Sequence, residues 1–421
     1  MSKFDDFIVE LCPDGMEYRR LGGTNGICEV LPSGIDKVLD ENERPVKLCN
    51  YMDVYNNQYI TDALIAGFMN GSVNDSEYQK FVLRAGQVLL TKDSETKEDI
   101  AQSAYVCSDF DDVVCGYHLA ALTPKSDIDG KYLNYALQSH DLRKYFWKMT
   151  NGVSRFGLKL KSIEDALIPV PPLPVQQEIV RILDKLTTLE TELEAKLEVE
   201  LEARKKQYNY YRDELLTFSN DVGRKTLGEI ATDMYRGSGI KRDQVTETGT
   251  PCVRYGEIYT TYNIWFDSCV SHTDAKDISS KKYFEHGDIL FAITGESVGE
   301  IAKSCVYVGH EKCLAGGDIV VMKHNETPKY LAYALSTTDA QMQKSKGKVK
   351  SKVVHSSVPA LKAIEIPVPP REEQERIVAI LDRFDALVND ITQGLPAEIE
   401  ARRKQYEYYR DKLLTFKEVG A

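Results

Sequence analysis

The sequence lacks the signals of export, of membrane insertion and of a structural metal. Its first residues, Met1 to Asp6, do not form a basic and apolar leader, and no apolar run is long enough to span a bilayer. The nine cysteines are scattered, without a CxxC pair or a histidine at ligand spacing. This pattern argues against a disulfide framework and a zinc site. We therefore expect a soluble, cytoplasmic protein with no metal and no membrane partner.

Motifs for catalysis are also missing. There is no glycine-rich phosphate loop, no Pro-Pro-aromatic stretch of an amino-methyltransferase, and no histidine placed with a nucleophile and an acid. Asp75 with Glu95 and Lys97 has the loose spacing of a metal-dependent nuclease, but such spacing arises often by chance. We expect a binding protein that is not an enzyme and needs no cofactor. An enzyme with an unrecognised site stays an alternative.

The chain has no surplus of positive charge. Its net charge is -12, and even the segment 219–366 holds only 19 Lys and Arg against 18 Asp and Glu. Any polyanion must therefore be held by local patches, with help from a partner.

What the sequence does contain is a long internal repeat. The stretch ARKKQYNYYRDELLTF at 203–218 returns as ARRKQYEYYRDKLLTF at 401–416, with 13 of 16 positions identical. Upstream of both lies Ile-Pro-Val-Pro-Pro, at 168–172 and 366–370. The spacing is 198 residues throughout, so one unit is used twice.

The repeat predicts four segments. Residues 1–167 and 220–366 have short β-rich runs broken by turns and one helical stretch each, which predicts two mixed α/β (α+β) domains. Residues 168–219 and 367–421 are helical spacers, each entered through a stiff proline joint.

Each spacer carries one apolar stripe that needs a partner. In the first spacer the stripe runs from Ile179 through Leu189, Leu193 and Leu201 to Leu215. We expect the two helices to pack on each other as an antiparallel coiled coil, which gives the chain a pseudo-twofold. The alternatives are that each helix packs only on its own domain, or pairs between chains. Gly394 and Pro396 should interrupt the second helix.

Polar loops in both domains suit DNA. In KSKGKVKSK five lysines alternate with other residues, and an extended chain would aim all five at a row of phosphates; a solvated loop without a function is the alternative. Amides and hydroxyls elsewhere could contact base edges. The candidate DNA-binding residues are Lys344, Lys346, Lys348, Lys350, Lys352, Arg236, Ser238, Ser297, Ser33, Asn57, Gln58, Lys92, Ser94, Asn151, Ser154 and Arg155.

The arrangement resembles the specificity subunit (HsdS family) of type I restriction-modification enzymes. The resemblance covers the full chain and is carried by the two proline joints, by QEIVRILD at 177–184 and QERIVAILD at 374–382, and by the two QYxYYRD ends. It implies two target-recognition domains that each bind half of a bipartite DNA site, and spacer helices that set the distance between the halves.

The resemblance also implies partners. Two methyltransferase subunits, which use S-adenosylmethionine, would dock on the spacers, and restriction subunits join in the full enzyme. The docking residues would be Arg204, Lys205, Gln207, Tyr210, Arg402, Arg403, Gln405 and Tyr408. A non-catalytic protein-interaction scaffold that does not bind nucleic acid is the alternative function.

Overall fold

The structure is a computed structural model that describes residues 12–13, 15–36, 39–219, 222–348, 353–389 and 395–418. The chain forms two compact units: the first combines Met1–Glu194 with Glu400–Ala421, and the second is Ala195–Ile399. No helix in the described ranges is both long and apolar enough to cross a membrane.

The first unit is built on a five-stranded sheet in the order β2-β10-β6-β8-β4. All neighbours are antiparallel except β4 and β8. The strands are β2 (Cys28–Pro32), β4 (Tyr59–Ile60), β6 (Val88–Thr91), β8 (Ser103–Val106) and β10 (Leu119–Pro124). A second sheet has the order β5-β3-β9, from β3 (Arg44–Cys49), β5 (Met69–Val73) and β9 (Val113–Cys115).

The inner strands of the five-stranded sheet are apolar on both faces because helices cover both faces. Val88 and Leu90 of β6 pack in one cluster with Leu133 of α4, whereas Leu89 packs in another with Val54 of α2. Successive side chains of a strand alternate between faces, so all of β6 is buried. The helices of this unit are α2 (Tyr51–Asn56), α3 (Asp75–Phe81), α4 (Gly130–Leu137), α5 (His140–Met149) and α6 (Leu160–Glu164), with the 3-10 turn η1 (Asp62–Gly67). Two strand pairs complete it, β1 (Tyr18–Arg20) with β12 (Leu167–Pro169) and β7 (Asp93–Ser94) with β11 (Phe156–Gly157).

The second unit repeats this plan. Its main sheet has the order β14-β24-β20-β22-β17, from β14 (Ala231–Arg236), β17 (Trp265–Phe266), β20 (Ile289–Ala292), β22 (Ser304–Tyr307) and β24 (Ile319–His324). Its other sheet has the order β15-β18-β16-β23-β19, from β15 (Val245–Thr246), β16 (Thr250–Val253), β18 (Ser271–Thr273), β19 (Tyr283–Phe284) and β23 (Cys313–Ala315). The helices are α8 (Leu227–Ile230), α9 (Tyr255–Thr260), α10 (Pro328–Leu335), α11 (Thr338–Ser345) and α12 (Val358–Lys362), with 3-10 turns η2 (Arg242–Gln244), η3 (Ala275–Asp277) and η4 (Val298–Glu300). The strand pairs are β13 (Arg224–Thr226) with β26 (Glu365–Pro367) and β21 (Thr294–Gly295) with β25 (Val354–His355).

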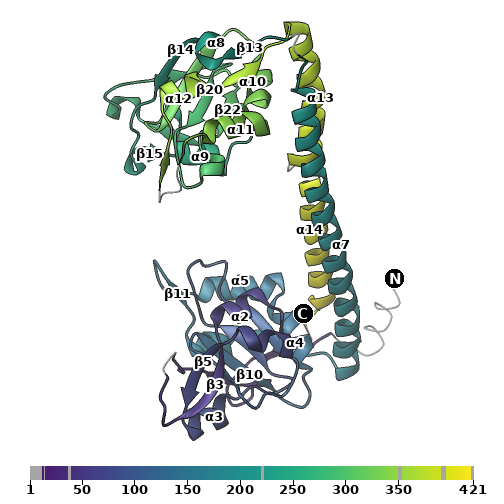
Figure 1. Cartoon of the computed structure of the whole chain (residues 1–421). Helices are drawn as coiled ribbons and strands as arrows, with labels where there is room; N and C mark the ends of the chain where they lie inside the picture. Colours follow the sequence, from purple (N-terminus) through teal and green to yellow (C-terminus); the bar gives the residue numbers. More distant parts are fainter. Residues whose placement is uncertain are drawn as a thin grey trace. The chain divides into compact units, whose positions relative to one another are not determined.

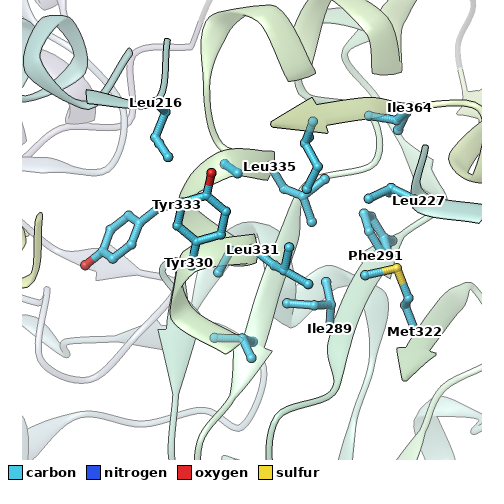
Figure 2. Packing of buried hydrophobic residues seen from close by; sticks show 14 of the residues in the cluster. Leu216, Leu227, Ile289, Phe291, Met322, Tyr330, Leu331, Tyr333, Leu335 and Ile364 are labelled. Atoms are coloured by element: carbon cyan, nitrogen blue, oxygen red, sulfur yellow. The ribbon is translucent and has the colours of Figure 1, made fainter. Parts of the chain in front are cut away.

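The core of the second unit lies between α10 and the main sheet. Ile289 and Phe291 of β20 meet Leu331 of α10 and Met322 of β24 (Figure 2). Leu216, just after the long helix α7, belongs to the same cluster. The spacer is therefore part of this core.

Three helices form the spacers, and Figure 1 shows α13 and α14 running beside α7. They are α7 (Leu173–Leu215), α13 (Arg371–Asn389) and α14 (Leu395–Leu414). The prediction that Gly394 interrupts the second helix falls on 390–394, outside the described residues. Pro396 lies in the first turn of α14, where proline is tolerated.

The long helix α7 pairs with a different helix in each unit, with α14 in the first and with α13 in the second. In the first unit α7 packs on α14: Thr187 Oγ1 lies 2.8 Å from Tyr406 Oη, and Glu194 pairs with Arg403. Residue numbers rise along one helix and fall along the other, so the pair is antiparallel. In the second unit Tyr211 of α7 stacks on Phe384 of α13, with ring centroids 5.8 Å apart. The predicted antiparallel pairing is confirmed, whereas packing of each helix only on its own domain is wrong.

The predicted apolar stripe of α7 is not buried along its whole length. Leu189 is 52% exposed and Leu193 is 37% exposed, whereas Ile179 and Leu183 are buried against Tyr132 and Tyr135. The N-terminal part of α7 thus packs on the α/β domain of the same unit, and apolar spacing alone did not show where that contact ends.

In each unit one aspartate of a spacer helix binds a lysine and a tyrosine of the α/β domain. In the first unit Asp184 of α7 accepts hydrogen bonds from Lys131 Nζ at 2.9 Å and Tyr135 Oη at 2.9 Å. In the second, Asp382 of α13 accepts from Lys329 Nζ at 2.8 Å and Tyr333 Oη at 2.6 Å. Tyrosines of α4 and α10 also donate to the proline joints, Tyr132 to Pro169 O at 2.8 Å and Tyr330 to Pro367 O at 2.9 Å. Both domains therefore share these contacts with their spacers, and the first unit adds Tyr59, whose Oη donates to Asp184 at 3.1 Å.

Candidate nucleic-acid interface

In the first unit, charged and aromatic side chains gather where β6 ends and β10 begins. His118, directly before β10, places Nδ1 2.7 Å from Asp93 Oδ2. Lys92 donates from Nζ to Ser33 O at 2.8 Å and lies 5.7 Å from the centre of the exposed Tyr117 ring. Burial lowers the pKa of Lys92, and the nearby Asp93 opposes that shift. We name Lys92, Asp93, Tyr117, His118 and Arg155 the first cluster.

Arg155 reaches this cluster from a neighbouring hairpin. Residues 151–155 are all exposed, and the chain returns through β11, which pairs with β7. The Arg155 guanidinium donates to His118 Nε2 at 3.3 Å. Three segments far apart in the sequence thus meet in one cluster, which is the kind of polar, partly cationic surface that contacts DNA.

The other predicted residues of the first unit divide into exposed and buried ones. Asn151 and Ser154 are exposed on the hairpin, as contact with DNA requires. Ser33 and Ser94 are buried, and their hydroxyls donate to Cys115 O and Thr96 O.

The two amides predicted to contact adenine are only partly exposed. The Asn57 amide donates to Asp53 O at 2.8 Å, and the Gln58 amide donates to the Gln138 side chain at 3.3 Å. Both side chains would have to leave these bonds to reach a base.

In the second unit Arg236 occupies the matching edge of the main sheet. Its guanidinium donates to Asp318 Oδ1 at 2.5 Å and to Gly317 O at 2.5 Å. Asp318 directly precedes β24, as His118 precedes β10. The chain after Arg236 crosses so close to Gly316 that a Cβ on Gly237 would lie 2.2 Å from Gly316 O, so only glycine fits there.

Beside Asp318 lies an open cavity of about 490 Å³. Arg242, Arg254 and Tyr255 line it, together with the backbone of Gly316 and Gly317. Arg254 is held by Glu257, with Nε 2.9 Å from Oε1. Of the predicted residues, Ser297 is exposed, whereas Ser238 is buried and its Oγ makes no hydrogen bond to the described part of the chain. We name Arg236, Asp318, Arg242, Arg254 and Tyr255 the second cluster.

The prediction of a row of five extended lysines is wrong at Lys344. This residue lies in α11 and is only 4% exposed, and its Nζ donates to Leu335 O at 2.8 Å and Ser304 Oγ at 3.2 Å. Lys346 is exposed, and Lys348 donates to His355 O at 2.7 Å. Lys350 and Lys352 lie outside the described residues. The alternation of lysines did not reveal that the helix continues to Ser345.

The docking residues implied by the resemblance lie on the outer faces of α7 and α14. Tyr210 and Tyr408 are 64% and 62% exposed, and each lies edge to face with the next tyrosine along its helix. The others are Arg204, Lys205, Gln207, Arg402, Arg403 and Gln405; all are exposed except the half-buried Lys205. Arg403 is engaged by Glu194.

Sequence reasoning did not select His118, Asp93, Asp318 or Arg254. A comparison of the two repeats does not reveal them, because one domain has His and the other has Asp directly before the equivalent strands β10 and β24. The available signal was positional: a polar residue that directly precedes an apolar strand lies at the edge of the sheet.

Comparisons with known proteins agree with this architecture. The type I restriction modification DNA specificity domain matches this chain twice, over residues 16–203 and 220–401. The specificity subunit of the Escherichia coli type I restriction enzyme EcoR124I/EcoR124II is 36% identical over 59% of this chain, and the match spans 61% of that subunit's length. A Haemophilus influenzae protein named as a type I restriction enzyme specificity subunit is 31% identical over 71% of this chain and 75% of its own length.

A solved structure shares the fold. A chain from work on complex assembly and conformational transition of the type I restriction-modification system superposes with a TM-score of 0.65 at 17% identity, over 96% of this chain and 98% of that chain. With both repeats matched by the same domain, this chain belongs to the type I restriction-modification DNA specificity family.

Proposed function

We propose that this chain is the DNA-binding specificity subunit of a type I restriction-modification complex. Each unit contacts one half of a bipartite duplex site, and methyltransferase subunits, joined by restriction subunits in the full enzyme, act where the chain places them. One observation carries the proposal: the same scaffold occurs twice, with different polar side chains at the same edge of its main sheet.

The distribution of repeated and divergent residues supports this function. Asp184 and Asp382 each accept hydrogen bonds from a lysine and a tyrosine at matching positions of the two domains. The first and second clusters differ, since His118 of the first stands at the position of Asp318 in the second and the arginines come from different elements. A protein that places two identical partners on two different half-sites needs the same contacts between domain and spacer in both repeats. It also needs different side chains at the two surfaces that contact DNA.

Docking of the partners on the spacers has its own support. The exposed tyrosine pairs at 210–211 and 408–409 recur with the same geometry on α7 and α14. Exposed aromatic side chains are typical of protein interfaces. Two equal docking surfaces fit two copies of one methyltransferase subunit. Because its substrate is DNA, the complex acts in the cytoplasm.

A protein-interaction scaffold that ignores DNA is the less favoured function, because the DNA specificity domain matches both units. Sequencing the methylated adenines of cells with and without this chain decides between the two. We expect one bipartite motif, with an unspecified gap, to lose its methylation when the gene is deleted. A methylome unchanged by the deletion would contradict the proposal, and so would methylation of DNA by the purified chain alone.

A further inference from the structure

We propose that Arg155 contacts a guanine in the half-site of the first unit and that His118, held by Asp93, is the residue that positions it. The inference rests on the proposed function, because it names the base-contacting group of one of the two units. Arginine is the side chain best suited to the two acceptors that guanine presents in the major groove.

The hydrogen bonds of the cluster assign the tautomer of the neutral His118 ring. A guanidinium can only donate, so His118 Nε2 accepts from Arg155 at 3.3 Å. Nδ1 therefore carries the proton and donates to Asp93 Oδ2 at 2.7 Å. Arg155 has five N–H donors. The contact with Nε2 orients the guanidinium and leaves donors for a base edge.

The backbone of His118 gives a second, independent observation. Its φ is +70°, in the left-handed region that non-glycine residues rarely adopt. Glycine would adopt this conformation at lower cost. Strain of this kind persists where a side chain is needed in a particular place.

The second unit uses the same position for the same purpose. Asp318 stands where His118 stands, directly before the second strand of the main sheet, β24 in place of β10, and it holds Arg236. The two arginines come from different elements, the β11 hairpin in one unit and the end of β14 in the other. A requirement of folding would not change both partners and keep the pairing, whereas two different half-sites would.

The contact between Arg155 and His118 is not what holds the hairpin. Asn151 and Gly157 already exchange two backbone hydrogen bonds of 2.9 Å, and β11 pairs with β7 through Phe156 and Ser94. Loss of the imidazole should therefore free Arg155 without unfolding the hairpin.

The test measures the sequence preference of the complex of this chain with its methyltransferase subunits. Duplexes randomised at every position of the site are selected by binding and sequenced. His118→Gly removes the imidazole and suits the backbone, and Arg155→Ala removes the guanidinium. We expect both variants to lose preference, by about 10- to 100-fold, at the same single G·C pair of one half-site. The other half-site should stay unchanged.

Two further variants sharpen the result. His118→Gln offers an amide oxygen to Arg155 in place of Nε2 and should restore part of the preference. Arg84→Ala is the matched control, because Arg84 is likewise an exposed arginine bonded to a side chain, Asp111 at 3.3 Å, but lies outside the cluster. It should change nothing.

Three outcomes would overturn the inference while the proposed function stands. They are an unchanged preference in His118→Gly, relaxation at different base pairs in the two variants, and loss of preference at both half-sites at an unchanged unfolding temperature. A wild-type complex that selects no sequence would instead contradict the proposed function itself.

Discussion

At the scale of single residues, burial decides what a charged side chain can do. Lys344 is enclosed in the core of the second unit, and burial lowers its pKa to about 7, with a smaller contribution from the positive charge of Arg212. Its hydrogen bonds to Leu335 and Ser304 satisfy the amine in the neutral state as well. Such a residue contributes to the stability of the fold and cannot contact a phosphate.

The depressed pKa of Lys344 predicts a dependence of stability on pH. Between pH 7 and 10.5 the unfolded chain binds a proton at Lys344 that the folded chain does not, so the free energy of unfolding rises with pH. Below pH 7 both states are charged, and the destabilisation is at its full value. In calorimetry of wild type and Lys344→Met, the wild type should gain stability relative to the variant from pH 7 to 10. The exposed Lys346→Met variant should show no such trend.

The remaining lysines of the loop make a separate prediction. Replacing Lys346, Lys348, Lys350 and Lys352 with Gln should weaken binding to every duplex. The slope of log K against log salt should fall by up to about 0.9 for each phosphate that is no longer neutralised. Titrations at several salt concentrations measure this slope. An unchanged slope would favour the alternative that the loop has no function.

At the scale of elements, the repeated QYxYYRD motif joins each spacer to the α/β domain of the other repeat. Asp213 of α7 accepts from Thr338 Oγ1 at 2.5 Å and from Thr338 N at 3.4 Å, at the start of α11. Asp411 of α14 accepts from His140 N at 3.1 Å, at the start of α5. A carboxylate at a helix N-terminus satisfies an unpaired N–H and interacts favourably with the helix dipole.

Because each spacer contacts the domain of the other repeat, a mutation in one spacer should affect the domain of the other repeat. Asp213→Ala should destabilise α11 by about 1 kcal/mol, and Asp411→Ala should do the same to α5. Hydrogen–deuterium exchange should therefore accelerate in the second α/β domain when the first spacer is mutated, and in the first α/β domain when the second spacer is mutated. Glu214→Ala, at the exposed neighbour of Asp213, is the control. Faster exchange in the domain of the same repeat would contradict the crossed arrangement.

Apolar periodicity and the internal repeat predicted the spacer helix well. Short matches of polar residues between the two domains were a poorer guide to which residues occupy equivalent positions. Within the predicted spacer 168–219, helix α7 runs from Leu173 to Leu215, directly after the proline joint. The sequence match of Ser33-Gly-Ile with Ser238-Gly-Ile, however, is shifted by one residue from the hydrogen-bond register. Ser33 N bonds Leu119 O, and the equivalent Ile319 O is bonded by Gly237 N. Short polar matches in loops carry too little information to fix a register.

The contacts of the candidate site could be predicted from sequence only in part. Arg155, Asn151 and Lys92 were selected by residue type and lie at or beside the first cluster. Whether a side chain is exposed depends on packing between distant segments, as Ser33, Ser238 and Lys344 show. His118 was not selected because its partners, Asp93 and Arg155, are 25 and 37 residues away in the chain.

At the scale of the whole molecule, the proposed function requires one chain to provide two equivalent places for a partner and two different contacts for DNA. α7 contributes its first part to one unit and its last part to the other, so its length is the natural candidate for the parameter that sets the gap between half-sites. Helix geometry makes this idea testable, since each added residue contributes ~1.5 Å and ~100°.

The last prediction is that the helices act as a ruler. Four residues inserted between Leu193 and Leu201 lengthen α7 by ~6 Å and turn the C-terminal part of this helix by only ~40°. A matching insertion between Asn389 and Leu395 is needed because α7 pairs with α14 in one unit and α13 in the other. Methylome sequencing should show both half-sites unchanged and a gap longer by at most ~2 base pairs. Two-residue insertions, which turn the stripe by ~200°, should instead break the pairing and abolish methylation. An unchanged gap, or altered bases in either half, would mean that the helices do not set the spacing.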